Sequence, residues 1–189
     1  MKQAYLDTNV ILSLLRSQEE NYSLIQSLTR LENFTFFTGT ITILEITSVL
    51  TREEKVFKEA LVNLSKEIDI RDLISLSFEE QIIIIIEFLF KSFNITILDE
   101  PVLETIQINE KKISIQSLYV LGIKWAEKIK LRTLDLIHLM TIVYYNQLKN
   151  VKFDYFITSD RAILGKRVEI QANIESLVTD PEGLLKIER

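Results

Sequence analysis

The sequence contains no cysteine, one histidine, four glycines and two prolines in 189 residues. The absence of cysteine excludes a disulfide framework and a thiolate metal site, and a single histidine argues against zinc. With so little glycine and proline we find no linker, and the sequence shows neither an internal repeat nor a low-complexity tract. We therefore expect one domain over residues 1–189, and the missing cysteines fit a cytoplasmic protein.

Positive charge is also scarce, because the formal net charge at pH 7 is -5. A protein that binds nucleic acid through overall charge should be basic, so such a role here requires a local basic patch or metal ions. The longest apolar run, "QIIIIIEFLF" at residues 81–90, is too short to span a bilayer and predicts a buried helix. The start, "MKQAYLDTNV", lacks the long apolar region of a signal peptide, so we expect no membrane association.

Hydrophobic periodicity predicts alternating strands and helices. Short β-branched and aromatic runs predict strands at residues 3–7, 34–38, 94–98 and 155–158. Amphipathic or strongly helix-forming stretches predict helices at residues 9–16, 20–31, 41–52, 53–67, 77–92, 114–129 and 133–149, with a short helix at "DRAILGK". Residues 102–113 are compatible with strand or loop. The alternation predicts an α/β fold with a mostly parallel central sheet, and residues 53–93 form a helical elaboration.

Four acidic residues occupy unusual positions in this pattern. Asp7 and Asp160 each follow a predicted strand and precede a helix, where an acid either caps the helix or lies at the ligand-binding edge of the sheet. Glu45 and Asp135 lie among apolar residues on predicted helices, where an isolated buried carboxylate is costly unless it is paired, protonated or bound to metal. The alternatives are an exposed Glu45 on an irregular helix and a first-turn Asp135 favoured by the helix dipole.

One common cause explains all four acids. A doubly wound sheet would bring them to one cleft, where carboxylates repel one another unless cations lie between them. Oxygen ligands select hard cations such as Mg²⁺ or Mn²⁺, and a pair of such ions suits in-line displacement at phosphorus by a metal-activated water. The sequence has no GxxxxGK[ST] loop, no GxSxG elbow and no second histidine for acid–base ribonuclease chemistry. His138 either hydrogen-bonds to a neighbouring carboxylate or is structural.

The order of these motifs resembles the PIN-domain ribonuclease family, which includes VapC-like toxins. The resemblance rests on "YLDTNVIL", on Glu45 in "ITILEITSVL", on Asp135 in "LRTLDLIHLMTIVYY" and on Asp160 in "YFITSDRAIL". It implies a Rossmann-like α/β/α sandwich and endonucleolytic cleavage of RNA with Mg²⁺ or Mn²⁺. It makes the four acids the catalytic and metal-holding set, supported by the polar residues Asn9, Thr158 and Ser159.

The resemblance also implies partners. Family members commonly form homodimers, and many are toxins that pair with an antitoxin protein, whereas others trim ribosomal RNA precursors. This chain differs from the short toxins by its long helical stretch between Glu45 and Asp135, which puts the toxin role in question more than the chemistry.

Two basic clusters are predicted to contact single-stranded RNA near the acids. One leads into the Asp135 helix and the other follows Asp160; they comprise Lys128, Lys130 and Arg132, and Arg161, Lys166 and Arg167. Ordinary solvated helix ends are the alternative interpretation.

Two other functions stay open, a non-catalytic PIN-like scaffold or RNA-binding protein and a haloacid-dehalogenase-type phosphatase. The phosphatase usually has a second Asp where this chain has Asn9.

Overall fold

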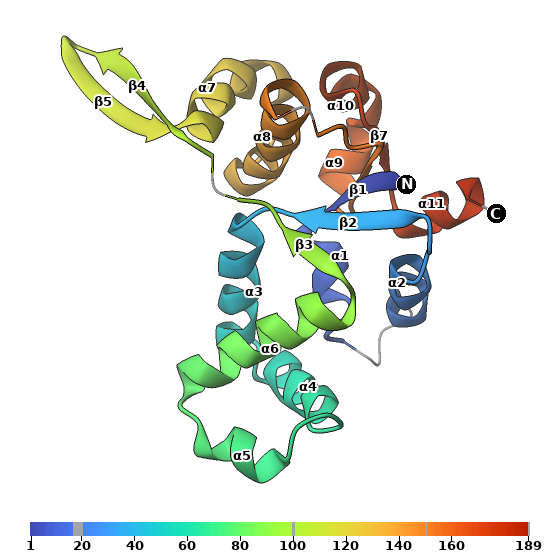
Figure 1. Ribbon diagram of the computed structural model, residues 1–189. Coiled ribbons are helices and arrows are strands. Elements are labelled where there is room, and N and C mark those ends of the chain that lie inside the picture. The colour runs from blue at the N-terminus through green and yellow to red at the C-terminus, as the bar shows by residue number, and fades with distance from the viewer. Residues whose placement is uncertain (17–20, 100, 150, 189) are drawn as a thin grey trace.

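A five-stranded parallel sheet forms the centre of the computed structural model, which describes residues 1–16, 21–99, 101–149 and 151–188 (Figure 1). The sheet order is β3-β2-β1-β6-β7, with bounds β1 Lys2–Leu6, β2 Phe34–Thr38, β3 Ile95–Ile97, β6 Tyr155–Ile157 and β7 Leu177–Thr179. Every neighbouring pair is parallel, so all five carboxyl ends lie at one edge. The order reverses between β1 and β6, the switch point at which open α/β sheets bind ligands.

Successive side chains of β1 point to opposite faces of the sheet, and each face has its own apolar core. Ala4 and Leu6 belong to one apolar cluster, and Tyr5 belongs to the other. Among the described residues, seven helices contribute to the first apolar cluster, and α5 lies farthest from the sheet (Figure 1). They are α1 Thr8–Leu12, α2 Asn21–Thr29, α3 Ile41–Arg52, α4 Glu54–Leu64, α5 Ile70–Ser75, α6 Phe78–Ser92 and α11 Pro181–Ile187. The second face is covered by α7 Ser117–Ile129, α8 Thr133–Leu148, α9 Arg161–Gly165 and α10 Arg167–Ile174 (Figure 1). The predicted α/β/α sandwich is confirmed.

The isoleucine-rich run forms α6, as predicted, and it packs into the first core. Its buried residues are Ile82, Ile85, Ile86, Leu89 and Phe90. Helices α4 and α6 both contact α3 and share its apolar cluster, so the elaboration is continuous with the sheet's core. Over the described ranges, no helix has the length and apolarity needed to cross a membrane. Assignment of residues 1–189 to a single domain stays a prediction.

The N-terminus of α6 provides a test of helix capping. Ser77 accepts a hydrogen bond from the Glu80 N–H at 3.3 Å, and the Glu80 carboxylate accepts one from the Ser77 N–H at 2.7 Å. We expect Ser77→Ala to cost about 1 kcal/mol, because the Glu80 N–H loses the hydroxyl that accepts its hydrogen bond. Thermal unfolding should show a fall of roughly 2–4 °C in Tm. Ser75→Ala, which removes an exposed hydroxyl outside the cap, is the control and should leave Tm almost unchanged.

The segment after β3 is an antiparallel hairpin that projects from the body, with β4 at Leu103–Ile108 and β5 at Lys111–Gln116 (Figure 1). Asn109 and Glu110 form its turn with positive φ angles of 46° and 65°, the backbone that two-residue hairpins favour. The predicted helix start at residue 114 is wrong, because residues 114–116 pair with β4 instead. Sequence reasoning missed the hairpin because Glu110 occupies the second turn position, where glycine is typical.

Other element boundaries differ by a few residues. The predicted helix 53–67 is the shorter α4, and the predicted helix 9–16 is α1 followed by a turn. The first residue of the predicted helix 20–31 lies outside the described residues, and the rest contains α2. Sequence reasoning did not predict α5, α10, β7 or α11. Residues 177–179 are too few to show strand periodicity, and their pairing with β6 forms the strand.

Candidate functional site

All four predicted acids line one cavity of about 410 Å³ at the carboxyl edge of the sheet. Asp7 directly follows β1, and Asp160 lies three residues beyond β6. Glu45 projects from α3, and Asp135 from the first turn of α8. The cavity therefore occupies the switch point between β1 and β6, where the parallel topology gathers residues distant in sequence.

Asp7 is held by hydrogen bonds from two polar neighbours. Its Oδ2 accepts a bond from the Thr158 hydroxyl at 2.5 Å and from the Asn9 amide at 2.9 Å. Although Asp7 is at the N-cap position of α1, its side chain makes no capping hydrogen bond. Burial raises the pKa of Asp7, the charge of His138 and the Thr158 bond lower it, and the net shift is upward. The fixed orientation suits a ligand role better than a cap.

Asn9 joins the ends of the two central strands. Its amide donates to Asp7, and its Oδ1 accepts a hydrogen bond from the Ser159 N–H at 3.0 Å. Thr158 also accepts the Asp160 N–H at 3.0 Å, so one hydroxyl connects two of the acids. The structure thus places Asn9 and Thr158 beside Asp7, while Ser159 enters this network through its backbone.

Glu45 is half-buried and paired with the single histidine. Its Oε2 lies 2.9 Å from His138 Nε2 and accepts a hydrogen bond from the Thr8 hydroxyl. Burial raises the pKa of Glu45, but the His138 hydrogen bond and charge outweigh it and leave the pKa below its ordinary value. Burial lowers the pKa of His138, but Glu45, Asp7 and Asp135 outweigh it and leave that pKa raised. The two shifts have the directions expected of a hydrogen-bonded carboxylate and imidazole, in which each group favours the charged form of the other.

Tyr5 and Thr8 extend this pair, and sequence reasoning missed both. The Tyr5 hydroxyl lies 2.8 Å from His138 Nδ1 and accepts the Gly39 N–H at 3.0 Å. Thr8 Oγ1 lies 3.3 Å from His138 Nε2, in addition to its bond to Glu45. The signal was weak: a tyrosine in a buried strand looks like core, and Thr8 looks like the start of a helix.

Asp160 does cap a helix. Its Oδ1 accepts hydrogen bonds from the N–H groups of Ala162 at 2.6 Å and Ile163 at 3.2 Å in the first turn of α9. Both capping bonds use the same oxygen, and the carboxylate also lines the cavity. The capping interpretation and the cavity interpretation are therefore compatible for this residue.

Asp135 has an uncompensated oxygen. Its Oδ2 is buried without a hydrogen-bond partner, one of few such side-chain atoms in the described chain. Burial raises the pKa of Asp135, and the charges of Asp160 and Asp7 raise it further, against smaller opposing effects of His138 and Arg132. A buried acceptor without a donor normally costs free energy, and an unpaired carboxylate oxygen in an acidic cavity has the chemistry of a cation ligand.

The donor set fits a hard divalent cation in its chemistry. Asp7, Asp135 and Asp160 offer carboxylate oxygens, which Mg²⁺ and Mn²⁺ prefer. Within the described residues, no three histidine or acidic side chains are already grouped as one ligand shell. An ion would therefore have to draw these carboxylates closer together, and Asp135 Oδ2 has no hydrogen bond to give up in doing so.

The two basic clusters are adjacent in space. Lys166 Nζ donates to the carbonyl oxygens of Ile129 at 2.5 Å and Lys130 at 3.0 Å, which ties the end of α9 to the end of α7. This ammonium is thus engaged in closing a helix end, whereas the other five basic side chains are exposed; these are Lys128, Lys130, Arg132, Arg161 and Arg167. Arg52, at the end of α3, also lines the acidic cavity, and sequence reasoning did not single it out.

These features define a doubly wound α/β protein with an acidic cleft at its switch point, and comparison with known proteins identifies the family. The PIN domain model matches residues 4–164, so the chain belongs to the PIN domain family, whose members are nucleases. A solved structure of VapBC2 from Rickettsia felis bound to a DNA fragment from their promoter matches with a TM-score of 0.48 and 10% identity, over 94% of this chain and 98% of that one. Comparison with curated proteins finds no match.

Proposed function

We propose that this protein is a metal-dependent endoribonuclease that cleaves RNA phosphodiester bonds. The observation that carries the proposal is the buried, unpartnered Asp135 Oδ2 in a cavity lined by four acids. Acidic side chains that line one cavity repel one another, which a cation would relieve, and membership of a nuclease family supplies the reaction class. Asp7, Glu45, Asp135 and Asp160 are the proposed catalytic and metal-holding set.

The chain's own residues would prepare this site in different ways. Thr158 and Asn9 orient Asp7, and His138 and Thr8 hold Glu45 ionised and directed toward the cavity. Bound Mg²⁺ or Mn²⁺ would supply an activated water and charge stabilisation at the leaving oxygen. A fixed ionised Glu45 beside the cavity would orient an attacking water without having to lose a proton first.

The exposed basic residues near the cleft are the proposed contacts for the RNA backbone. Arg132 precedes the Asp135 turn, and Arg161 follows Asp160, so both lie within a few residues of the acids. A small patch on an acidic protein suits single-stranded RNA, because an extended duplex would also meet the negative surface.

The remaining parts of the proposal concern partners and the rival functions. We extend the family's homodimer and antitoxin pairing to this chain, and light scattering on the purified protein tests whether it is a homodimer.

The phosphatase interpretation loses its support, because Asn9 is an amide that donates to Asp7 and the chain belongs to another family. A non-catalytic PIN-like protein stays the rival that needs an experiment.

The direct test is cleavage of labelled single-stranded RNA with Mn²⁺, Mg²⁺ or EDTA, beside Asp7→Asn. We expect cleavage only with metal, and a loss of about 10²–10³-fold in the variant because Asp7 would hold the ion. A melting curve of Asp7→Asn must show a folded protein. Absence of cleavage together with no rise in Tm on adding Mn²⁺ would support the non-catalytic rival.

A further inference from the structure

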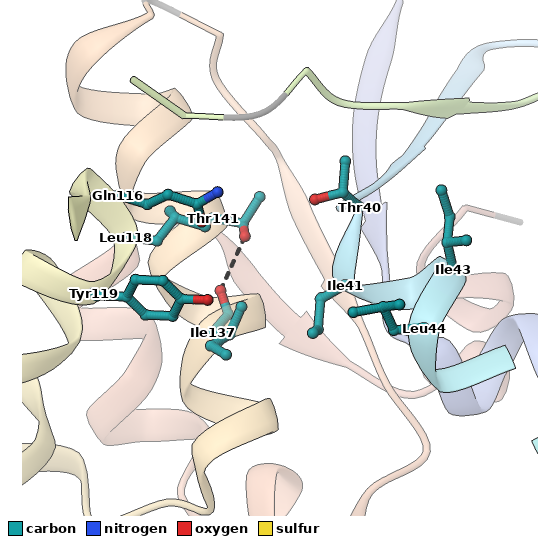
Figure 2. Close-up of a pocket in the computed structure, with 9 residues that line it drawn as sticks. All are labelled: Thr40, Ile41, Ile43, Leu44, Gln116, Leu118, Tyr119, Ile137 and Thr141. Carbon is teal, nitrogen blue, oxygen red and sulfur yellow. Dashed lines mark hydrogen bonds between the residues drawn. The ribbon is translucent and has the colours of Figure 1, made fainter. Parts of the chain in front are cut away.

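A second cavity opens beside the acidic one, and we call it the lateral groove. It has a volume of about 330 Å³ and separates the start of α3 from α7 and α8. Figure 2 shows its two walls, with Thr40, Ile41 and Leu44 on one side and Gln116, Leu118 and Tyr119 on the other. A groove of this size lies at the lower end of the range of small-ligand sites, which is roughly 300–1,000 Å³.

The lateral groove adjoins the acidic cavity, and the two share lining residues on α3. Ile41 and Leu44 line both cavities, one turn before Glu45 and immediately before it. On the facing helix α8, Asp135 lines the acidic cavity and Ile137 lines the groove. A chain whose phosphate lay among the acids would therefore have its neighbouring unit at the mouth of the groove.

The lining has the chemistry of a base site. The Tyr119 ring is 49% exposed and points into the gap, opposite aliphatic side chains that include Leu44, which is 66% exposed (Figure 2). An exposed aromatic ring on one wall and aliphatic side chains on the other are groups against which a flat base can pack (Figure 2). The Thr40 hydroxyl and the Gln116 amide extend toward the gap from opposite walls, and such groups can hydrogen-bond to base edges (Figure 2).

The charge distribution favours the same occupant. The exposed residues Arg132 and Arg161 lie at the Asp135 and Asp160 side of the acidic cavity, whereas the groove opens at its Ile41 and Leu44 side. An RNA strand would thus run from the basic clusters, across the acids, to an uncharged groove. A groove without lysine or arginine in its lining suits a base rather than another phosphate.

We propose that the lateral groove holds a nucleobase adjacent to the scissile phosphate and that Tyr119 and Gln116 determine the base preference of the enzyme. This inference rests on the proposed ribonuclease function and adds a specificity site to it. Tyr119 stacks on the base, and Gln116 reads its edge. Neither residue touches the reacting atoms, so their loss should affect RNA binding and sequence preference more than the chemical step.

The test compares cleavage of short single-stranded RNAs that differ in one base near the cut, using Tyr119→Ala, Tyr119→Phe and Gln116→Ala. Tyr119→Ala should raise KM about tenfold, with kcat little changed, because one stacking contact is lost. Tyr119→Phe should retain the wild-type KM, and Gln116→Ala should flatten the base preference. Ile123→Ala is the matched control, since it removes an exposed apolar side chain of α7 outside the groove.

An RNA lacking the base at the affected position completes the test. The KM of the wild-type protein for this RNA should rise to the KM of Tyr119→Ala, while the KM of the variant should not rise further. If wild type cleaves RNA and Tyr119→Ala has the same KM and the same base preference, the inference is overturned. The proposed function is then intact.

The inference remains testable if wild type cleaves no RNA and the proposed function fails. Binding of the same oligonucleotides to wild type and Tyr119→Ala is then measured by fluorescence anisotropy. Weaker binding by the variant would support a base site in a non-catalytic protein. Equal binding by the two proteins would overturn it.

Discussion

Asp135→Asn is expected to raise the Tm of the metal-free protein while reducing metal-dependent RNA cleavage by about 10³-fold. The stability gain follows from the raised pKa of Asp135, which burial and the charges of Asp160 and Asp7 produce. Removing the Asp135 charge relieves this repulsion and gives the buried position a neutral amide. Because Asp135 is only partly buried, solvent screens part of this repulsion, and we expect a small rise in Tm.

A fall in the Tm of Asp135→Asn relative to wild type would contradict this explanation. If Asp135 were only a first-turn acid favoured by the α8 dipole, its neutralisation should lower Tm by a small amount. Asp72→Asn provides that comparison, because Asp72 is an exposed first-turn acid of α5 away from the cavity. Thermal unfolding of wild type and both variants in EDTA separates the two explanations.

Adding Mn²⁺ extends the same experiment. A ligand that binds only the folded state raises Tm, so wild type should gain stability with Mn²⁺ concentration. Asp135→Asn should gain much less, since it lacks the uncompensated oxygen that an ion would use. Asp72→Asn should respond like wild type. An equal response of all three proteins would place the ion elsewhere.

His138→Ala is expected to be the most destabilising single change in the site. The imidazole lies 2.9 Å from Glu45 Oε2, 3.5 Å from Asp7 Oδ1 and 2.8 Å from the Tyr5 hydroxyl. Its removal leaves the carboxylates without their buried counter-charge, which costs about 3–5 kcal/mol. Thermal unfolding in EDTA should show a Tm about 10 °C lower.

The pH dependence identifies the electrostatic part of this loss. The pKa of His138 is raised above 6.5 in the folded state, so its stabilisation is full below about pH 6.5 and is lost as pH rises through the folded value. The pKa of Glu45 is lowered below 4.5, so its contribution is present above about pH 4.5 and is lost as pH falls. The difference in unfolding free energy between wild type and His138→Ala should therefore be largest between these limits.

Two control variants separate charge from packing. His138→Gln retains a hydrogen-bond donor without the charge and should lose less stability than His138→Ala, with a flatter pH profile. Tyr5→Phe removes the hydroxyl partner of His138 Nδ1 and should cost about 1 kcal/mol. A destabilisation by His138→Ala that is the same at every pH would show that the residue serves only packing.

The parallel sheet and most of its helices could be predicted from sequence because their signals are local. Strand runs such as "FTFFT" carry their own β propensity, and the Ser77 capping box marks the start of α6 within four residues. The hairpin of β4 and β5 lacked such a signal, since Ile113 and Ile115 fit either structure. Only the pairing of Ile113 with Ile106 and of Ile115 with Glu104 makes that segment a strand.

By itself the sequence determined the α/β class, and it predicted that the four acids form one set, because strand-end aspartates and helix-borne carboxylates have no inexpensive local explanation. The tertiary structure decided what each acid does. It gives Asp160 a cap, pairs Glu45 with His138, and leaves the Asp135 Oδ2 without a partner. These differences depend on which buried dipoles and charges reach each carboxylate. Neighbours such as Glu45 and His138 are distant in the chain and meet only through packing of α3 against α8.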